Sequence, residues 1–580
     1  MKPYDTIIKN GTVVDGLRNS KRRADVGIKD GVIAAIGKLS AGDAQRVLEA
    51  DDLIVAPGFV DLHTHYDSQL FWDPYCSSSS WHGVTTAVIG NCGYGFAPCR
   101  VEDRDRTMLS VTRVEGVPLE TLKNGMPWDW ITFPEYVESV TRAPKAINVA
   151  INMPLNPLMV WVMGLERAKA GALPTDEEHR EMRLLLNEAM DAGAIGFSAQ
   201  RFGKHTSHPD FDGTPIPTDV LHNETMLSLG EVLRERGEGF IQYSYTDLAE
   251  YFGGPGNDFG KPEQAHPHVE QLAACSAGSI LFYPGRVDSA LDWVKSCHER
   301  GLPVYAHRPT CILQCPPALL SVTEGANQLD ESITWRDATV GGIEEIRVRL
   351  NAPDVRARLR EDLKGLSVES WVLLRASAPA NPKYEGMSIG QIAALQGAQS
   401  HVDIFLDITT EGDMTAEWSV PACSNPGLDT FKRLTEYDHW IPGISDGGAH
   451  TKNVNTAFYS TLFLMTYVRE HGWISLEDAH YRLSALPARI AGLQQNVGTL
   501  SVGAPADIVV YDLNNLLIAA PQKLYDYPAN QWRLADRGIG YRWVMVNGEV
   551  VIENDKETRT FPGRVVHTAR YESRRSGQRS

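Results

Sequence analysis

The chain has 580 residues, of which 43% are hydrophobic and 22% are charged. This is the composition of a globular protein, and it excludes a mostly disordered chain, a collagen-like repeat and a small disulfide-stapled scaffold. The 55 Lys and Arg residues against 73 Asp and Glu residues give a net charge of −18, which argues against nucleic acid as the main partner because an acidic surface repels phosphate.

Residues 1–52 are predicted to form a small antiparallel β unit. Short β-branched or alternating runs are separated by Asn10-Gly11 and Asp30-Gly31, which are typical of hairpin turns. The predicted strands are Tyr4–Lys9, Gly11–Val14, Asp25–Lys29 and Val32–Ile36.

Residues 53–496 alternate short apolar runs with helical patterns, which indicates parallel β/α units. The predicted strands are Leu53–Leu62, Thr85–Gly90, Ala146–Asn152, Ala194–Ser198, Gly239–Tyr243, Ser279–Tyr283, Pro303–His307 and Ile441–Ser445. Eight such strands match a TIM-type (β/α)8 barrel. Thr175 and Glu178 have the spacing of a capping box at the start of a helix over 176–192. The stretch from about 308 to 440 is too long for one crossover, so we expect an insertion there.

The C-terminal region is predicted to return to the first β unit. Ala506–Tyr511 is a β-branched run, and Tyr541–Val546 and Glu549–Ile552 flank the turn signal Asn547-Gly548. We therefore expect a composite β-sandwich from residues 1–52 and 497–563, so the predicted fold class is α/β: a TIM-type barrel plus a small β-sandwich. Residues 564–580 form a basic tail, expected to be a loose arm or an oligomer contact.

Nothing in the sequence predicts a membrane segment or a secretory signal. The longest apolar run, residues 456–468, is shorter than the roughly 20 residues that a span needs and is typical of a buried helix. The N-terminus lacks the apolar core of a signal peptide. The 8 cysteines include no CxxC pair, so we expect free thiols and a cytoplasmic location.

Two histidines end the first predicted barrel strand. His63 and His65 are two residues apart, so their side chains project to the same side from the carboxyl end of the strand. In a barrel this is the end where active sites lie, and imidazole binds Zn²⁺, Fe²⁺ or Mn²⁺. Surface strand ends also carry this pattern, so the pattern alone leaves both interpretations open.

Two further residues end neighbouring predicted strands. Cys92 lies between Asn91 and Gly93 after the second strand, where a thiolate could ligate or bridge metals, although the residue alone favours a small buried structural thiol. Asp446 follows the last strand, where a carboxylate binds metal and accepts a proton from water. An Asp before Gly-Gly is also a common turn signature.

Taken together, these segments resemble the amidohydrolase superfamily, and within it the N-acyl-D-amino-acid deacylase (D-aminoacylase) family. The resemblance covers nearly the whole chain. It is carried by APGFVDLHTHYD (56–67), GVTTAVIGNCGYGFAP (83–98), DAGAIGFSAQR (191–201), GISDGGAH (443–450), LPARIAGL (486–493), VGTLSVGAPADIVVYD (497–512) and VMVNGEVV (544–551).

The resemblance implies a metal-dependent hydrolase on a barrel with a small β domain. By it, His63, His65 and Asp446 are ligands of one metal, and Cys92 is a further ligand or bridge in the place where other amidohydrolases have a carboxylated lysine. The implied cofactor is Zn²⁺, one or two ions, with another divalent metal as the alternative.

The sequence also departs from the family pattern. The deacylases carry a histidine at the ends of strands five and six, whereas residues 239–244 and 280–284 contain none. A single ion therefore becomes plausible, and D-amino-acid specificity does not carry over. His307, at the end of the seventh strand, is a candidate ligand or substrate-binding residue, or a polar strand end. Arg201 and His205, after the fourth strand, are candidate anchors for a substrate carboxylate, or surface-loop residues.

We therefore predict a metal-dependent amidohydrolase that cleaves the amide bond of an N-acyl amino acid or a related small amide. The metal lowers the pKa of its water, and Asp446 is the predicted catalytic residue that accepts the proton and passes it to the leaving amine. The alternatives are a non-catalytic binding or scaffold protein of the same fold and a hydrolase of an ester, a lactone or a cyclic amide. The expected partner is a small molecule, with a homo-oligomer left open.

Overall fold

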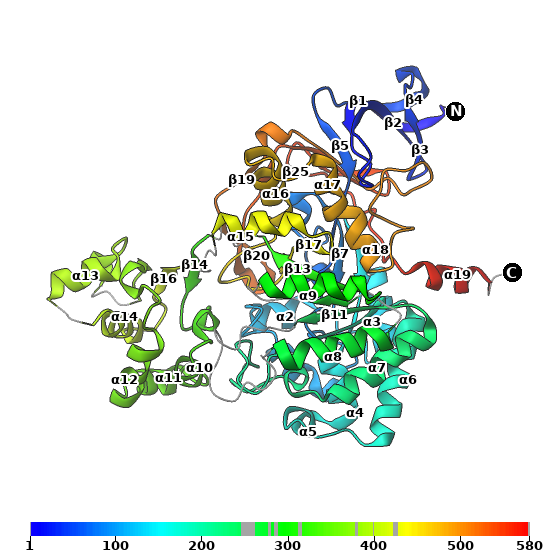
Figure 1. Cartoon of the computed structure of the whole chain (residues 1–580). Helices are drawn as coiled ribbons and strands as arrows, with labels where there is room; N and C mark the ends of the chain where they lie inside the picture. The colour runs from blue at the N-terminus through cyan, green and yellow to red at the C-terminus, as the bar shows by residue number, and fades with distance from the viewer. Residues whose placement is uncertain are drawn as a thin grey trace.

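The computed structural model describes residues 2–244, 262–276, 280–282, 288–310, 316–377, 381–397, 400–421 and 427–577. The chain is a mixed α/β protein (Figure 1). Its strands form one sheet built from both ends of the chain, which we call the end-to-end sheet, a set of parallel strands, a separate three-stranded sheet and two two-stranded sheets. None of the helices in these ranges is both long and apolar enough to cross a membrane.

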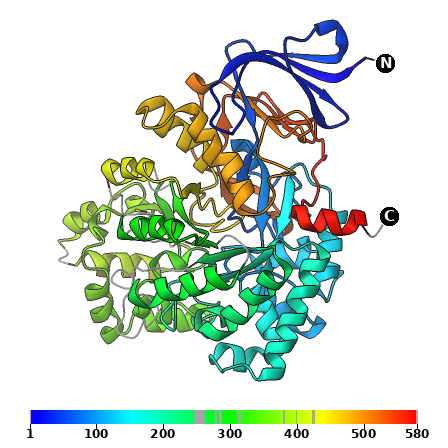
Figure 2. The ribbon, with the colours of Figure 1, turned by 45° about the vertical axis from the view of Figure 1, so that its right-hand side comes forward.

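Strands from both ends of the chain share one nine-stranded sheet, in the order β25-β24-β23-β18-β5-β1-β2-β3, with β4 paired to β1. The strands are β1 (Tyr4–Val13), β2 (Arg22–Lys29), β3 (Val32–Gly37), β4 (Ala44–Glu49), β5 (Ile54–Pro57), β18 (Ile508–Tyr511), β23 (Tyr541–Val546), β24 (Glu549–Glu553) and β25 (Lys556–Glu557). The two halves meet where β5 and β18 pair antiparallel, with Val55 opposite Val510. The N-terminal strands stand above the rest of the molecule in both views (Figure 2).

One predicted hairpin turn is a bulge instead. The chain runs through Asn10-Gly11 within the single strand β1, and its register shifts between Ile8 and Gly11. Asn10 takes the left-handed φ of 60°, and a Cβ on Gly11 would lie 2.3 Å from a methyl carbon of Val55. The Asn10-Gly11 pair therefore indicated a residue with a left-handed backbone conformation, which occurs both in β-bulges and in tight turns.

The central strands are parallel and form sheets of six and three strands, in the orders β17-β13-β12-β11-β10-β9 and β6-β7-β8. They are β6 (Phe59–Asp61), β7 (Val84–Ile89), β8 (Asn148–Ile151), β9 (Met153–Pro154), β10 (Gly196–Gln200), β11 (Phe240–Ser244), β12 (Ile280–Phe282), β13 (Val304–Pro309) and β17 (Trp440–Gly443). The consecutive strands β8 and β9 link the two sheets on one side, and a parallel bridge between Thr64 and Gly447 links them on the other. Each predicted strand overlaps one of these strands; Ser279 and Tyr283 lie outside the described residues.

The first predicted strand, Leu53–Leu62, is divided at Gly58. Residues before it form β5 in the end-to-end sheet, and residues after it form β6 in the parallel set. Gly58 donates its N–H to the backbone oxygen of Asp507 at 2.9 Å. A Cβ at Gly58 would lie 2.1 Å from the Thr85 hydroxyl oxygen, so only glycine fits where the chain passes from one sheet to the other.

Helices lie outside the parallel strands (Figures 1 and 2). They include α3 (Phe133–Arg142), α4 (Leu155–Met163), α6 (Asp176–Ala192), α7 (Asn223–Arg236), α8 (Pro262–Cys275), α9 (Asp288–Glu299), α16 (Tyr459–Phe463), α17 (Leu476–His480) and α18 (Leu486–Ile490). The predicted capping box is present at α6, since Thr175 Oγ1 accepts the Glu178 N–H at 3.2 Å and Glu178 Oε2 accepts the Thr175 N–H at 2.7 Å. The apolar run over 456–468 is helical, and its Leu462 and Phe463 are fully buried.

The long stretch between β13 and β17 holds a unit with its own core, to one side of the molecule in Figure 1. Its elements are β14 (Ala318–Leu320), β15 (Val372–Arg375), β16 (Glu417–Val420), α10 (Ile333–Ala338), α11 (Ile343–Leu350), α12 (Pro353–Asp362), α13 (Ile389–Gln396) and α14 (His401–Thr410). Trp371 and Trp418 both pack edge-on against Phe405 in that core. We call residues 316–421 the inserted unit.

The basic tail is bonded to the parallel strands instead of forming a loose arm. Gly563 donates to the backbone oxygen of Lys145, and Val149 and the tail exchange two backbone hydrogen bonds of 2.9 Å. Beyond these bonds, α19 (Ala569–Gly577) carries Arg574, which pairs with Glu238 at 2.5 Å. The backbone of the tail thus pairs with the edge of β8 and extends the three-stranded sheet β6-β7-β8, because that edge of the short strand β8 presents backbone donors and acceptors to it.

Candidate functional site

The candidate site lies where the parallel strands end. His63 and His65 follow β6, Cys92 follows β7 and Asp446 follows β17. Cys92 and Asp446 have left-handed φ angles of 54° and 47°, values that few non-glycine residues adopt. These turns bring the chain back over the strand ends, and such local strain is typical of functional sites.

The structure brings the four predicted ligands together. His63 Nε2 lies 3.2 Å from Cys92 Sγ and 3.3 Å from Asp446 Oδ1. His65 Nε2 lies 3.7 Å from the same Asp446 oxygen. The candidate ligand atoms of His63, His65 and Cys92 all lie within 4.8 Å of one another. Two imidazole nitrogens, one sulfur and one carboxylate oxygen therefore surround a single small volume.

Burial gives the histidines the protonation state that a metal ligand needs. Desolvation lowers the pKa of His63 and lowers that of His65 well below its ordinary value, so both imidazoles are neutral and keep a lone pair. The same desolvation raises the pKa of the Cys92 thiol far above its ordinary value. The thiolate form of Cys92 therefore needs a compensating positive charge beside the sulfur, which a bound cation supplies.

Backbone contacts fix the two histidines. The His65 N–H donates to the backbone oxygen of Gly447 at 2.7 Å, and Ser445 Oγ donates to the backbone oxygen of His63 at 3.0 Å. A Cβ on Gly447 would lie 2.6 Å from the Tyr66 hydroxyl oxygen. The Gly447 position thus lets the loop after β17 approach His63 and His65 closely enough to carry Asp446 to them.

Strand β11 supports Cys92 through two polar side chains. The Cys92 N–H donates to Gln242 Oε1 at 2.7 Å, and Cys92 Sγ lies 3.1 Å from Ser244 Oγ. Gln242 Nε2 in turn donates to Ser244 Oγ at 2.8 Å. The role of Gln242 and Ser244 was not predicted from the sequence, although their spacing of two at the carboxyl end of a strand places both side chains on the same side.

His307 lies next to the site and is engaged with the backbone. Its ring centre is 5.9 Å from that of His63, and its Nε2 accepts the Ile444 N–H at 2.8 Å. This bond ties β13 to the loop that carries Asp446, and it leaves His307 Nδ1 buried without a hydrogen-bond partner among the described residues. A role of His307 toward metal or substrate stays a prediction.

The polar contacts of Arg201 and His205 among the described residues do not involve the four predicted ligands. Arg201 is 2% exposed, and its guanidinium donates to Asn223 at the start of α7. His205 is half-buried, and within the described part of the chain it makes no hydrogen bond or ion pair with the four predicted ligands. Their predicted role as carboxylate anchors is not tested by these contacts.

Three further titratable residues adjoin the site. Glu115 Oε1 lies 3.7 Å from His65 Nδ1, and His450 Nε2 lies 3.9 Å from Asp446 Oδ2. The His208 ring is 6.1 Å from that of His450. Desolvation raises the pKa of Glu115 and lowers that of His208 to about 3. His450 belongs to the quoted GISDGGAH segment, whereas Glu115 and His208 come from loops whose path the sequence does not show.

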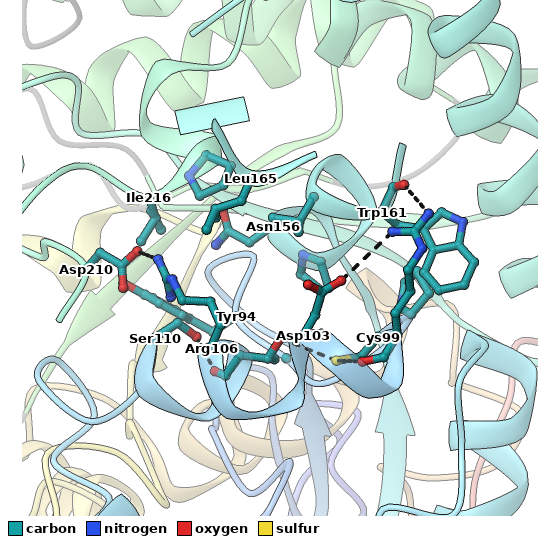
Figure 3. Close-up of a pocket in the computed structure, with 17 residues that line it drawn as sticks. Tyr94, Cys99, Asp103, Arg106, Ser110, Asn156, Trp161, Leu165, Asp210 and Ile216 are labelled. Carbon is teal, nitrogen blue, oxygen red and sulfur yellow. Dashed lines mark hydrogen bonds and ion pairs between the residues drawn. The ribbon is translucent and has the colours of Figure 1, made fainter. Parts of the chain in front are cut away.

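Cavities surround this cluster. A cavity of about 10 Å³ is lined by His65, Glu115 and Tyr94. Tyr94 also lines a cavity of about 60 Å³ (Figure 3), in which Arg106 extends to Asp210. A third cavity, of about 710 Å³, lies between residues 109–119 and the inserted unit. The cavity that touches His65 is small, and none of the four predicted ligands lines the largest one.

The chain is similar to known proteins along most of its length. A sequence model described as the amidohydrolase family matches residues 46–224 and 388–552. The chain is 26% identical to the N-acyl-D-glutamate deacylase of Alcaligenes xylosoxydans xylosoxydans over 97% of this chain and 96% of that protein, and 26% identical to its D-aminoacylase over 97% and 98%. A solved N-acyl-D-glutamate deacylase from Bordetella bronchiseptica, complexed with zinc and a phosphonate inhibitor, has the same fold, with a TM-score of 0.64 at 23% identity over 97% of this chain and 100% of that one. The resemblance stated from the sequence motifs is confirmed.

Proposed function

The chain belongs to the amidohydrolase family, and from that premise we propose that it hydrolyses the amide bond of an N-acyl amino acid or a related small amide with the help of a bound divalent metal ion. The observation that carries the proposal is that Cys92 Sγ and Asp446 Oδ1 lie 3.2 and 3.3 Å from His63 Nε2. Two of the relatives that match along nearly the whole chain are an N-acyl-D-glutamate deacylase and a D-aminoacylase, which supports this substrate class.

The residues at the site fit a metal ion. The imidazoles of His63 and His65 and the sulfur of Cys92 are buried donors within 4.8 Å of one another, and nitrogen with sulfur ligands favours Zn²⁺. We assign His63, His65, Cys92 and Asp446 as the residues that hold it. When bound, such an ion supplies an acidified water and polarises the amide carbonyl.

Asp446 is the residue that we assign to proton transfer. Its side chain is 21% exposed, against 5% for His63 and 6% for His65, so it faces the open side of the cluster. From there its carboxylate can accept a proton from the attacking water and deliver it to the departing amine nitrogen. Asp446 Oδ2 points to His450 Nε2 at 3.9 Å, and this histidine is placed to orient the carboxylate.

The chain differs from the deacylase pattern at the strand ends where a second metal ion would be held. The resemblance expects histidines after strands five and six, and this chain has Gln242 and Ser244 on β11 and Phe282 at the end of β12. Gln242 and Ser244 are bonded to Cys92 and to each other, which supports a site with one tightly held ion. Arg201, His205 and His307 remain the proposed substrate-binding residues.

We also propose the finer architecture. The parallel strands close as an eight-stranded barrel over 53–496, with β8 and β9 as its third strand and the Thr64–Gly447 bridge as its closure. The nine-stranded sheet, whose strands lie within residues 4–57 and 508–557, is one layer of the β-sandwich. Residues of about 308–440 are the insertion, and a cytoplasmic location stays a prediction.

The test is hydrolysis of a panel of N-acetyl amino acids of both hands by the zinc-loaded protein, with release of the free amino acid as the readout. The proposal expects turnover that His63→Ala abolishes. Turnover of esters or lactones but no amides would replace the amide assignment. Stoichiometric zinc without turnover of any panel member would favour a binding protein of this fold.

A further inference from the structure

Glu115 lies against the side of His65 that faces away from the predicted metal position. His65 Nε2 is directed to Asp446 Oδ1 at 3.7 Å, whereas His65 Nδ1 faces Glu115 Oε1, also at 3.7 Å. The imidazole is thus bracketed by one carboxylate at each nitrogen. A hydrogen bond at Nδ1 would need a closure of about 0.8 Å from the present separation.

The carboxylate of Glu115 is buried without an evident counter-charge. Glu115 is 4% exposed, and its Oε2 has no hydrogen-bond partner among the described residues. An isolated buried carboxylate is costly unless a donor or a positive charge compensates it. An imidazole whose other nitrogen holds a divalent ion is a strong N–H donor, and it faces this carboxylate. Metal-bound histidines commonly donate to such an outer carboxylate.

Two loops hold the backbone of Glu115. The Thr451 N–H donates to the backbone oxygen of Glu115 at 3.1 Å, and Thr451 Oγ1 donates to that of Gly116 at 2.7 Å. Thr451 follows Asp446 in the same loop. Glu115 is therefore fixed relative to both the metal-ligand loop and His65, which is what orienting a ligand requires.

The inserted unit reaches the same segment. Arg113 Nε and Nη2 donate to the two oxygens of Asp330 at 2.8 and 2.6 Å, and these side chains are only 9% and 0% exposed. Asn327 Nδ2 donates to the backbone oxygen of Val114 at 3.0 Å, and Asn327 Oδ1 accepts from Asn453 Nδ2 at 2.6 Å. The inserted unit thus bonds to the segment of Glu115 and to the loop after Asp446.

We propose that Glu115 is a positioning residue that orients His65 through Nδ1, and that the inserted unit holds Glu115 in place through the Arg113–Asp330 pair. This inference rests on the proposed metal site. It gives the inserted unit a part in metal binding although none of the predicted ligands lies in it. The proposal also distinguishes Glu115 from the metal ligands. Variants of Glu115 are expected to change the zinc affinity and to leave the number of bound ions unchanged.

The experiment measures zinc affinity and zinc stoichiometry by competition with a chromophoric chelator on the full-length protein. Glu115→Gln should weaken zinc binding ~10–100-fold at unchanged stoichiometry, the usual effect of losing an outer carboxylate. Glu115→Asp should recover part of the affinity. The exposed Glu120→Gln is the matched control and should leave the affinity unchanged. The absorption of the cobalt-substituted protein should shift in Glu115→Gln and stay the same in the control.

Asp330→Asn should weaken zinc binding in the same direction by roughly 2–10-fold, as expected for a contact one step further out. Because a broken buried pair can disturb folding, Arg113→Met/Asp330→Leu replaces both charges and should show the same loss of affinity. The exposed pair Arg358–Asp354, also in the inserted unit, supplies the control Asp354→Asn.

The outcomes separate the two claims. Failure of the wild-type protein to bind zinc would remove the metal site itself and the proposed function with it. Zinc binding by the wild type with an unchanged affinity in Glu115→Gln would overturn only the inference. A lower stoichiometry in Glu115→Gln would make Glu115 a direct ligand and would also overturn it.

Discussion

Gln242 Oε1 accepts the backbone N–H of Cys92 at 2.7 Å, which fixes the left-handed turn that carries the thiol to His63. The contact joins the ends of two parallel strands, β7 and β11, that are not neighbours in a sheet. The resemblance expects a metal-binding histidine near this strand end. In this chain the strand end supports the cysteine instead.

Gln242→Ala should weaken zinc binding and destabilise the fold. The Cys92 N–H would remain buried without its acceptor, which costs about 1–3 kcal/mol. Chelator competition and urea unfolding measure the two effects, and the exposed Gln396→Ala is the control. Unchanged zinc affinity in Gln242→Ala would mean that the position of Cys92 does not depend on this bond.

Asp446→Asn should abolish turnover at saturating zinc. The amide keeps an oxygen toward the cluster but cannot accept the proton, and loss of a general base typically costs ~10²–10⁴-fold in rate. Steady-state kinetics with zinc in excess separates this effect from weakened binding. A variant with kcat within a factor of about two of wild type would move the general base to another residue.

The contribution of Asp507 to the stability of the fold should fall as the pH rises from about 4 to 7. Burial raises the pKa of this carboxyl to about 7, against ~3.9 in the unfolded chain. The native state therefore holds the proton more tightly, so its contribution to stability is fully present below pH 4 and is lost as the pH rises through 7. The free energy of unfolding of Asp507→Asn, relative to that of the wild type, should therefore increase as the pH rises from about 4 to 7. Equal slopes for both proteins would contradict the assignment.

Removal of the basic tail should destabilise the protein. A chain that ends at residue 562 loses the three backbone hydrogen bonds of Gly563, Arg564 and Val566, each worth about 1 kcal/mol, and the Arg574–Glu238 pair. The urea midpoint should fall, whereas a chain that ends at residue 577 should unfold like the full length. Equal midpoints for the shorter and full-length chains would show that the tail is not part of the cooperative unit.

Much of the fold could be predicted from the sequence because its signals are local. Apolar runs, Asp30-Gly31 and Asn547-Gly548 mark strands and turns by residue type, and the HxH spacing places two histidines on one side of a strand. The division at Gly58 could not be predicted, because it depends on Thr85 and on the backbone of Asp507.

The site was predictable only where a strand end carried a recognisable motif. His63, His65, Cys92 and Asp446 follow strands directly, so the topology brings them together. Glu115 reaches the site from a loop whose position depends on contacts with Thr451 and Asp330. No spacing in the sequence encodes such contacts, because they join segments hundreds of residues apart.

Metal content per chain tests the central claim most directly. Mass spectrometry on protein purified without chelator should find at least one equivalent of zinc, and His63→Ala and Cys92→Ala should each lower it. His63 supplies a nitrogen donor and Cys92 a sulfur donor, and the two atoms lie 3.2 Å apart. We therefore expect that neither residue can hold the ion without the other. No bound metal in the wild type, and none taken up on incubation with Zn²⁺, Mn²⁺ or Fe²⁺, would contradict the account.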